Sequence, residues 1–72
     1  MEEYSRILIE EYCTNHNSAK SRRLRKLVEK SYNIYSQFTE SDGFFIERCI
    51  EEETDSKFKE ALEDLDKFMF GL

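Results

Sequence analysis

A thiol and an imidazole are the first side chains in the sequence with a potential for covalent chemistry. Cys13 and His16 stand three positions apart, so a helix would make them neighbours. Nucleophilic catalysis also needs a group that orients the base, and the sequence indicates none. A chain of 72 residues has little room to enclose a substrate cavity. We therefore interpret His16 as an exposed loop residue beside a half-buried Cys13, and we predict that the protein is not an enzyme.

Metal binding is the second chemistry that these residues suggest. Cys13, His16 and Cys49 with one carboxylate would supply four ligands. Structural zinc sites normally carry two pairs of ligands at short spacing, and this sequence has one such pair. The carboxylates are numerous because the composition is acidic, so their pairing does not indicate general acid–base chemistry. The sequence also lacks a glycine-rich phosphate loop and an EF-hand loop. We expect neither a metal nor a cofactor.

The basic residues are concentrated in one segment. The chain has 16 acidic and 11 basic residues and a net charge of -5, yet residues 20–30 are strongly basic. A helix over this segment would have a cationic outer face. Such a face can contact nucleic-acid phosphates, neutralise acidic helices in the same bundle or across a dimer, or bind an acidic protein. Nucleic-acid binding is our alternative function, with candidate residues Arg22, Arg23, Arg25, Lys26 and Lys30.

The second half of the chain is acidic and ends in aromatic residues. A surface of this charge can bind a basic partner, although it is more commonly only a solvated face. Residues 68–72 either dock on another protein or complete the core. Our leading hypothesis is a regulatory or adaptor protein that acts through protein–protein contacts. The candidate partner-binding residues are Glu51, Glu52, Asp55, Phe68, Phe70 and Leu72.

The size of the chain limits its stability. A single small domain buries a modest share of its surface, so a second subunit would add stability. Nothing indicates an oxidising compartment, and the two cysteines are expected to be reduced. No apolar run approaches the roughly 18 residues of a membrane span, and the acidic start does not resemble a signal peptide. We expect a cytoplasmic homodimer, or a subunit bound to a partner, without membrane association.

The elements that position these residues are predicted to be helices. The chain has no proline and two glycines, and its apolar spacing predicts helices over residues 2–14, 18–38, 43–53 and 55–70. The expected fold is an all-α bundle of three or four helices. Asn17 or Ser18 should cap the second helix without a capping box, since neither has Glu or Gln three residues on. The second helix should end near residues 39–43, where Asp42 and Gly43 form a turn pair. Its predicted core stripe is Leu24, Leu27, Val28, Ser31, Ile34, Tyr35 and Phe38.

The last two predicted helices have one alternative, a single kinked helix. On a straight helix, Phe45 and Cys49 would lie nearly opposite the stripe that begins at Phe58. A break at residues 53–56 removes this conflict and supplies three N-cap residue types. Gly71 is the expected C-cap.

Overall fold

The chain forms a four-helix bundle. The computed structural model describes residues 1–33, 35 and 37–71, and it contains no strand among them. The predicted all-α fold is therefore confirmed. The helices are α1 (Glu3–Asn15), α2 (Ala19–Ser31), α3 (Glu40–Glu52) and α4 (Ser56–Phe70). Within the described part of the chain, no helix is long and apolar enough to span a membrane.

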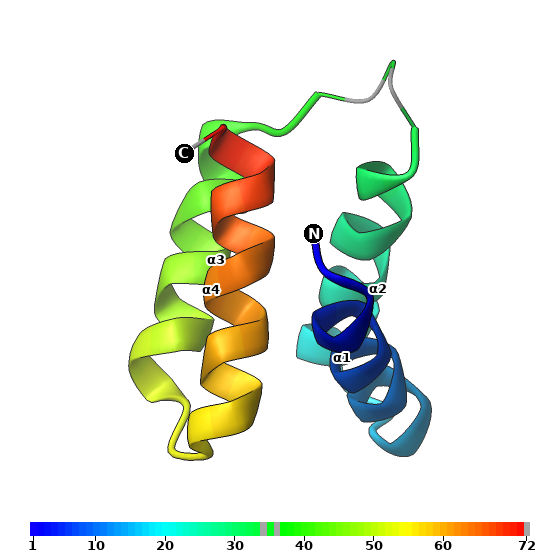
Figure 1. The fold of residues 1–72 in the computed structure, drawn as a ribbon, viewed down its shortest axis with the longest axis vertical. Coiled ribbons are helices and arrows are strands. Elements are labelled where there is room, and N and C mark those ends of the chain that lie inside the picture. The colour runs from blue at the N-terminus through cyan, green and yellow to red at the C-terminus, as the bar shows by residue number, and fades with distance from the viewer. Residues whose placement is uncertain (34, 36, 72) are drawn as a thin grey trace.

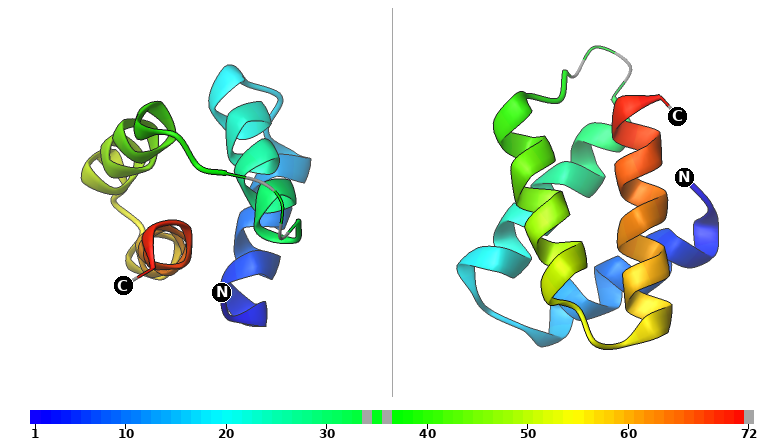
Figure 2. Two further views of the ribbon diagram at one scale, coloured as in Figure 1. Left: turned by 90° about the horizontal axis from the view of Figure 1, so that it is seen from above. Right: turned by 90° about the vertical axis from the view of Figure 1, so that its left-hand side faces the viewer.

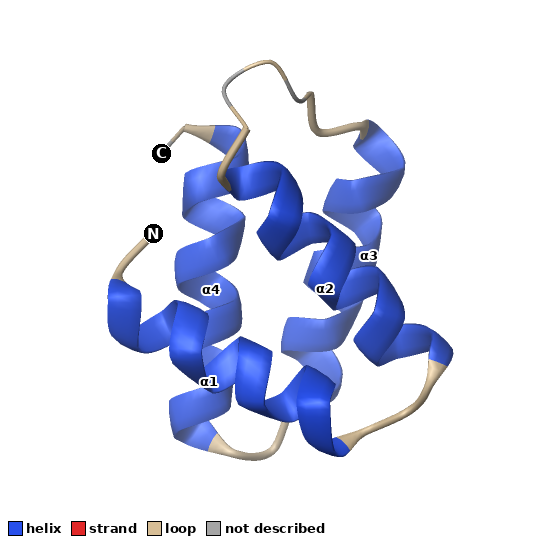
Figure 3. Cartoon of the chain, turned by 90° about the vertical axis from the view of Figure 1, so that its right-hand side faces the viewer, coloured by secondary structure: helices blue, strands red, loops and turns tan. Residues whose placement is uncertain are grey.

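The helices pack as two antiparallel pairs (Figure 1). α1 and α2 form one layer, and α3 and α4 form the other, as the view from above shows (Figure 2). Seen from the side of α1 and α2, these two helices cross in front of the second layer (Figure 3). α4 contacts each of the other three helices, so its apolar stripe is the centre of the core. The buried apolar residues are Ile9, Cys13, Leu24, Leu27, Val28, Ile46, Cys49, Phe58, Ala61, Leu62, Leu65 and Met69.

α2 ends at Ser31, so the prediction of a helix over residues 18–38 was wrong at its C-terminal end. The backbone N–H of Tyr35 donates to Asn33 Oδ1 at 2.9 Å, and this local bond offers the chain an alternative to the helix. Tyr35 is 86% exposed rather than buried, whereas Phe38 packs partly against the core. Ile34, also predicted to be in the core, lies outside the described residues.

α3 begins at Glu40, so the prediction of a break over residues 39–43 and of a helix from 43 was also wrong. Thr39 and Asp42 form a capping box. Thr39 Oγ1 accepts from the backbone N–H of Asp42 at 3.1 Å, and Asp42 Oδ2 accepts from that of Thr39 at 2.9 Å. The pair Asp42 and Gly43 therefore lies in the first helical turn rather than in a loop.

α2 also has a capping box, which the sequence rule missed. Ser18 caps the helix as predicted, and its backbone N–H donates to Ser21 Oγ at 3.0 Å. The Ser21 hydroxyl donates to the carbonyl oxygen of His16 at 2.6 Å, which fixes it in place. A short hydroxyl that is held in this way performs the role that Glu or Gln usually performs.

The two-helix interpretation of residues 43–70 is correct. α3 ends at Glu52, and Asp55 caps α4 by accepting from the backbone N–H groups of Lys57 and Phe58 at 2.9 and 3.1 Å. Cys49 is buried and Phe45 packs against the core. Both can do so because the break after Glu52 lets α3 run in a different direction from α4. Gly71 ends α4 with φ of 71°, the conformation expected of a C-cap glycine.

Candidate functional site

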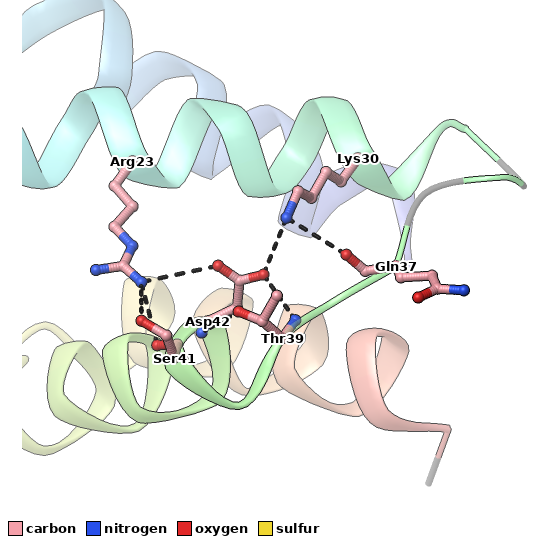
Figure 4. A network of polar contacts seen from close by, with 6 residues as sticks. All are labelled: Arg23, Lys30, Gln37, Thr39, Ser41 and Asp42. Atoms are coloured by element: carbon pink, nitrogen blue, oxygen red, sulfur yellow. Dashed lines mark hydrogen bonds and ion pairs between the residues drawn. The ribbon is translucent and has the colours of Figure 1, made fainter.

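Two of the basic residues on α2 bind a buried carboxylate on α3 (Figure 4). Asp42 is 7% exposed. Its Oδ2 lies 3.0 Å from Lys30 Nζ, and its Oδ1 lies 3.8 Å from Arg23 Nη2. Arg23 Nη2 also donates to Ser41 Oγ at 2.8 Å. These contacts hold the start of α3 against α2.

The charge of Asp42 depends on these partners. Burial tends to raise the pKa of this carboxyl, but the backbone N–H of Thr39 and the Lys30 ammonium outweigh burial and lower it. The carboxylate is therefore ionised at neutral pH. It neutralises part of the charge of Arg23 and Lys30, which also lie near aromatic rings. The Arg23 guanidinium carbon is 4.6 Å from the centroid of Phe45, and Lys30 Nζ is 5.9 Å from that of Phe38.

The five basic candidates therefore divide into two groups. Arg23 and Lys30 contribute to the bundle, which is the structural role considered for this segment. The other three, Arg22, Arg25 and Lys26, are exposed on the outer side of α2. The sequence could not separate the groups, because the position of Asp42 depends on where α3 begins.

The predicted partner-binding residues do not form one surface. Glu51, Glu52 and Asp55 lie at the turn between α3 and α4, whereas Phe68 and Phe70 lie at the opposite end of α4 (Figure 1). Asp55 serves as the N-cap of α4. Leu72 lies outside the described residues.

The two phenylalanines of α4 also face different neighbours. Phe68 lines a hollow with Met1, Arg6 and Tyr32, on the side of α1 and α2. Phe70 lies over Gly43 of α3, where a Cβ atom would be 3.0 Å from Phe70 Cζ. Each ring is 44% exposed. Only Phe70 therefore belongs to the surface of the acidic α3–α4 pair.

A different set of residues does share one surface. On α3 and on α4, residues at i, i+4, i+7 and i+11 lie on one helical face. The contact between Gly43 and Phe70 brings these faces together where α3 begins and α4 ends. We call this surface the acidic-aromatic face. It consists of Glu40, Phe44, Glu47 and Glu51 from α3 and Lys59, Glu63, Asp66 and Phe70 from α4.

The acidic-aromatic face combines charge with exposed apolar area. It carries five carboxylates and one ammonium group. Phe44 is 63% exposed and Phe70 is 44% exposed. Partial burial raises the pKa of Asp66. Sequence reasoning missed Phe44, because the predicted helix start put this residue at a helix end. The signal was its i+3 and i+7 spacing to Glu47 and Glu51.

The thiol of Cys13 and the imidazole of His16 each bond to a backbone carbonyl oxygen. Cys13 Sγ donates to the carbonyl oxygen of Ser21 at 3.2 Å. His16 Nδ1 lies 2.9 Å from the carbonyl oxygen of Tyr12, and its ring stacks on Tyr12. Burial raises the pKa of Cys13 and of Cys49, which keeps both as thiols. Among residues 1–33, 35 and 37–71, no cluster of three or more His, Cys, Asp and Glu side chains has the geometry of a metal site.

Comparison with known proteins adds no further constraint. No protein-family model, no curated protein and no solved structure matches the chain. The function is therefore inferred from the geometry and charge of the surfaces.

Proposed function

We propose that the protein is a non-enzymatic adaptor or regulatory protein that binds a basic partner protein through the acidic-aromatic face. The observation that carries this proposal is the exposure of two phenyl rings, Phe44 and Phe70, among five carboxylates. Aromatic side chains are frequent anchors of protein interfaces when a partner covers them. The surrounding carboxylates would attract a basic surface and orient it.

The dimensions of the face suit a helical partner. Its α3 stripe runs from Glu40 to Glu51, which corresponds to about 16 Å of helix at 1.5 Å per residue. An amphipathic basic helix of similar length would place apolar residues on the two rings and Lys or Arg side chains on the carboxylates. We therefore take a basic amphipathic helix as the partner element.

The nucleic-acid alternative has less support. Asp42 holds two of its five candidate residues, Arg23 and Lys30, in the bundle. Three exposed cations remain for phosphate contacts, on a protein with a net charge of -5. The homodimer and the cytoplasmic location stay predictions, of which gel filtration with light scattering tests the first.

A fluorescence anisotropy titration tests the proposal with a defined probe. The probe is a labelled synthetic peptide that forms an amphipathic helix, with leucines on one face and lysines and arginines on the other. Phe44→Ser should weaken its binding by about tenfold or more, the loss typical of an interface anchor. Tyr35→Ser is the matched control, because Tyr35 is 86% exposed and lies outside the face.

Charge variants complete the design. Glu47→Gln with Glu51→Gln should weaken binding and reduce its salt dependence. Glu10→Gln with Glu11→Gln removes the same charge from the exposed side of α1 and should have a smaller effect. Equal losses in the two pairs would show that only net charge matters, and the proposal would then be wrong.

A further inference from the structure

The outer side of α2 carries three cations that no internal carboxylate neutralises. In the described part of the chain, Arg22, Arg25 and Lys26 form no ion pair, whereas Arg23 and Lys30 both reach Asp42. The protein as a whole has 16 acidic residues and 11 basic ones. The unpaired cations therefore form a separate positive surface on an acidic protein.

These cations line a concave surface rather than a flat one. A groove of ≈ 390 Å³ runs between the C-terminal end of α1 and α2. We call it the basic groove. Its charged lining residues are Arg22, Arg25, Lys26 and Glu29, and His16 and Asn17 lie beside them. Three cations thus face one carboxylate in this space.

Neighbouring side chains hold parts of the groove in position. Arg22 Nη1 donates to Asn17 Oδ1 at 3.2 Å, which orients the guanidinium. Because a carbonyl oxygen can only accept, His16 Nδ1 carries the hydrogen in its contact with Tyr12. The stacked His16 ring lines the groove at the turn between α1 and α2. The parts of the groove that are held in this way lose less entropy when a ligand binds.

The spacing of the cations fits a single phosphate group. Arg22, Arg25 and Lys26 fall within about 6 Å along the helix axis, at i, i+3 and i+4. Two guanidinium groups and one ammonium group match the three oxygens of a phosphate monoester, and such charge-assisted bonds are among the strongest in proteins.

A nucleic-acid backbone fits the same surface less well. Glu10 and Glu29 line the α1–α2 surface beyond Arg25, in the direction of Tyr32. On the other side of α2, Arg23 and Lys30 are bound to Asp42. Carboxylates therefore lie on both sides of this positive surface, Glu10 and Glu29 on one side and Asp42 on the other, and they would repel the neighbouring phosphates of a strand.

We propose that the basic groove binds the phosphate of a phosphorylated serine or threonine side chain on a protein partner. This site lies in the α1–α2 layer and does not depend on the function proposed for the α3–α4 surface. A single groove with three donors recognises the phosphate more than the surrounding sequence. Binding would therefore be switched by phosphorylation of the partner.

Nuclear magnetic resonance titrations with defined probes test the site. The probes are O-phosphoserine, inorganic phosphate, and serine as the unphosphorylated control. Both phosphate probes should shift the amide signals of residues 16–26, and serine should not. Arg22→Gln with Arg25→Gln should weaken phosphate binding by about tenfold or more, since hydrogen bonds to charged groups are lost.

A matched variant and a DNA duplex distinguish phosphate binding in the groove from nonspecific charge effects and from nucleic-acid binding. Arg48→Gln with Lys57→Gln removes the same charge from exposed positions outside the groove and should leave phosphate binding unchanged. Equal weakening in both double variants, or shifts spread over the whole surface, would overturn the proposal. Binding of a mixed-sequence DNA duplex that is tighter than O-phosphoserine and lost in the groove variant would also overturn it, in favour of nucleic acid.

Discussion

The ring of Phe70, in the last turn of α4, lies against Gly43 in the first turn of α3. A methyl group at Gly43 would be 3.0 Å from Phe70 Cζ, so the absence of a side chain allows this close contact. The contact joins the two stripes of the acidic-aromatic face. It thereby places the Phe70 ring beside the first turn of α3, one residue before Phe44.

Gly43→Ala tests this relationship. Alanine is about 1 kcal/mol better than glycine inside a helix, and the half-exposed tip of Phe70 can move by a few tenths of an ångström. We expect the free energy of unfolding to rise by up to about 1 kcal/mol, with altered aromatic signals of Phe70 and weaker binding of the basic helical peptide.

Gly71→Ala is the control for that experiment, because the same substitution at this position should lower stability. Gly71 has φ of 71° and nothing near its Cβ position, so alanine there is strained and should cost about 1 kcal/mol. Denaturant titrations measure both variants. A large loss of stability in Gly43→Ala would show that the Phe70 ring is fixed, contrary to our interpretation.

Asp42→Asn tests the contact between α2 and α3. The variant removes the charge that binds Lys30 and Arg23 but keeps a side chain able to accept from Thr39. Because both cations remain about a third or more exposed, we expect a loss of about 1–2 kcal/mol rather than the larger cost of a fully buried pair. Glu47→Gln, on the exposed side of α3, should change stability by less than about 0.5 kcal/mol.

The contribution of Asp42 to the free energy of unfolding should depend on pH. Its pKa is lower in the folded protein than in the unfolded chain, so its contribution is complete above the ordinary Asp pKa of about 3.9 and is lost as the pH falls through the folded value. Urea titrations of wild type and Asp42→Asn should therefore converge in acid. A difference that stays constant down to acid pH would mean that the carboxylate charge contributes nothing.

The contribution of Asp66 to stability should depend on pH in the opposite direction. Burial raises its pKa, so the folded protein favours the protonated form, and stability falls as the pH rises through that raised value. Asp66→Asn should be neutral or stabilising at pH 7. Its difference from wild type should shrink as the pH falls, and a clearly destabilised variant at neutral pH would contradict this interpretation.

Asp55→Ala separates capping from partner binding. Asp55 caps α4 through the N–H groups of Lys57 and Phe58, so alanine should cost about 1 kcal/mol in unfolding experiments. Asp55→Ser should restore most of the stability, because serine is also a good cap. Both variants should bind the basic peptide as tightly as wild type. A loss of binding in both would mean that Asp55 contacts the peptide directly.

The sequence predicted the fold class and the burial of Leu24, Leu27 and Val28 on α2, because apolar spacing determines which helix face is buried. It missed the end of α2, where the Asn33 side chain bonds to the backbone, and it missed the start of α3. These boundaries are set by bonds between particular side chains and N–H groups. Periodicity alone does not contain that information.

The same limit explains what the sequence predicted of the surfaces. It identified the acidic half and the basic segment correctly as separate features. It could not predict that Asp42 would bind Lys30 and Arg23, or that Glu51 and Phe70 would lie on one face while Phe68 lies on another. Those groupings depend on how the helices pack against one another, which the periodicity within one helix does not determine.

Mapping the bound peptide on the protein tests the central claim most directly. The labelled basic helical peptide is added to isotopically labelled protein, and amide and aromatic signals are followed by nuclear magnetic resonance. We predict that the largest shifts fall on Phe44, Glu47, Asp66 and Phe70, in one contiguous patch on the outer side of α3 and α4. Shifts confined to the opposite layer, or distributed evenly over exposed carboxylates, would contradict a binding site on the acidic-aromatic face.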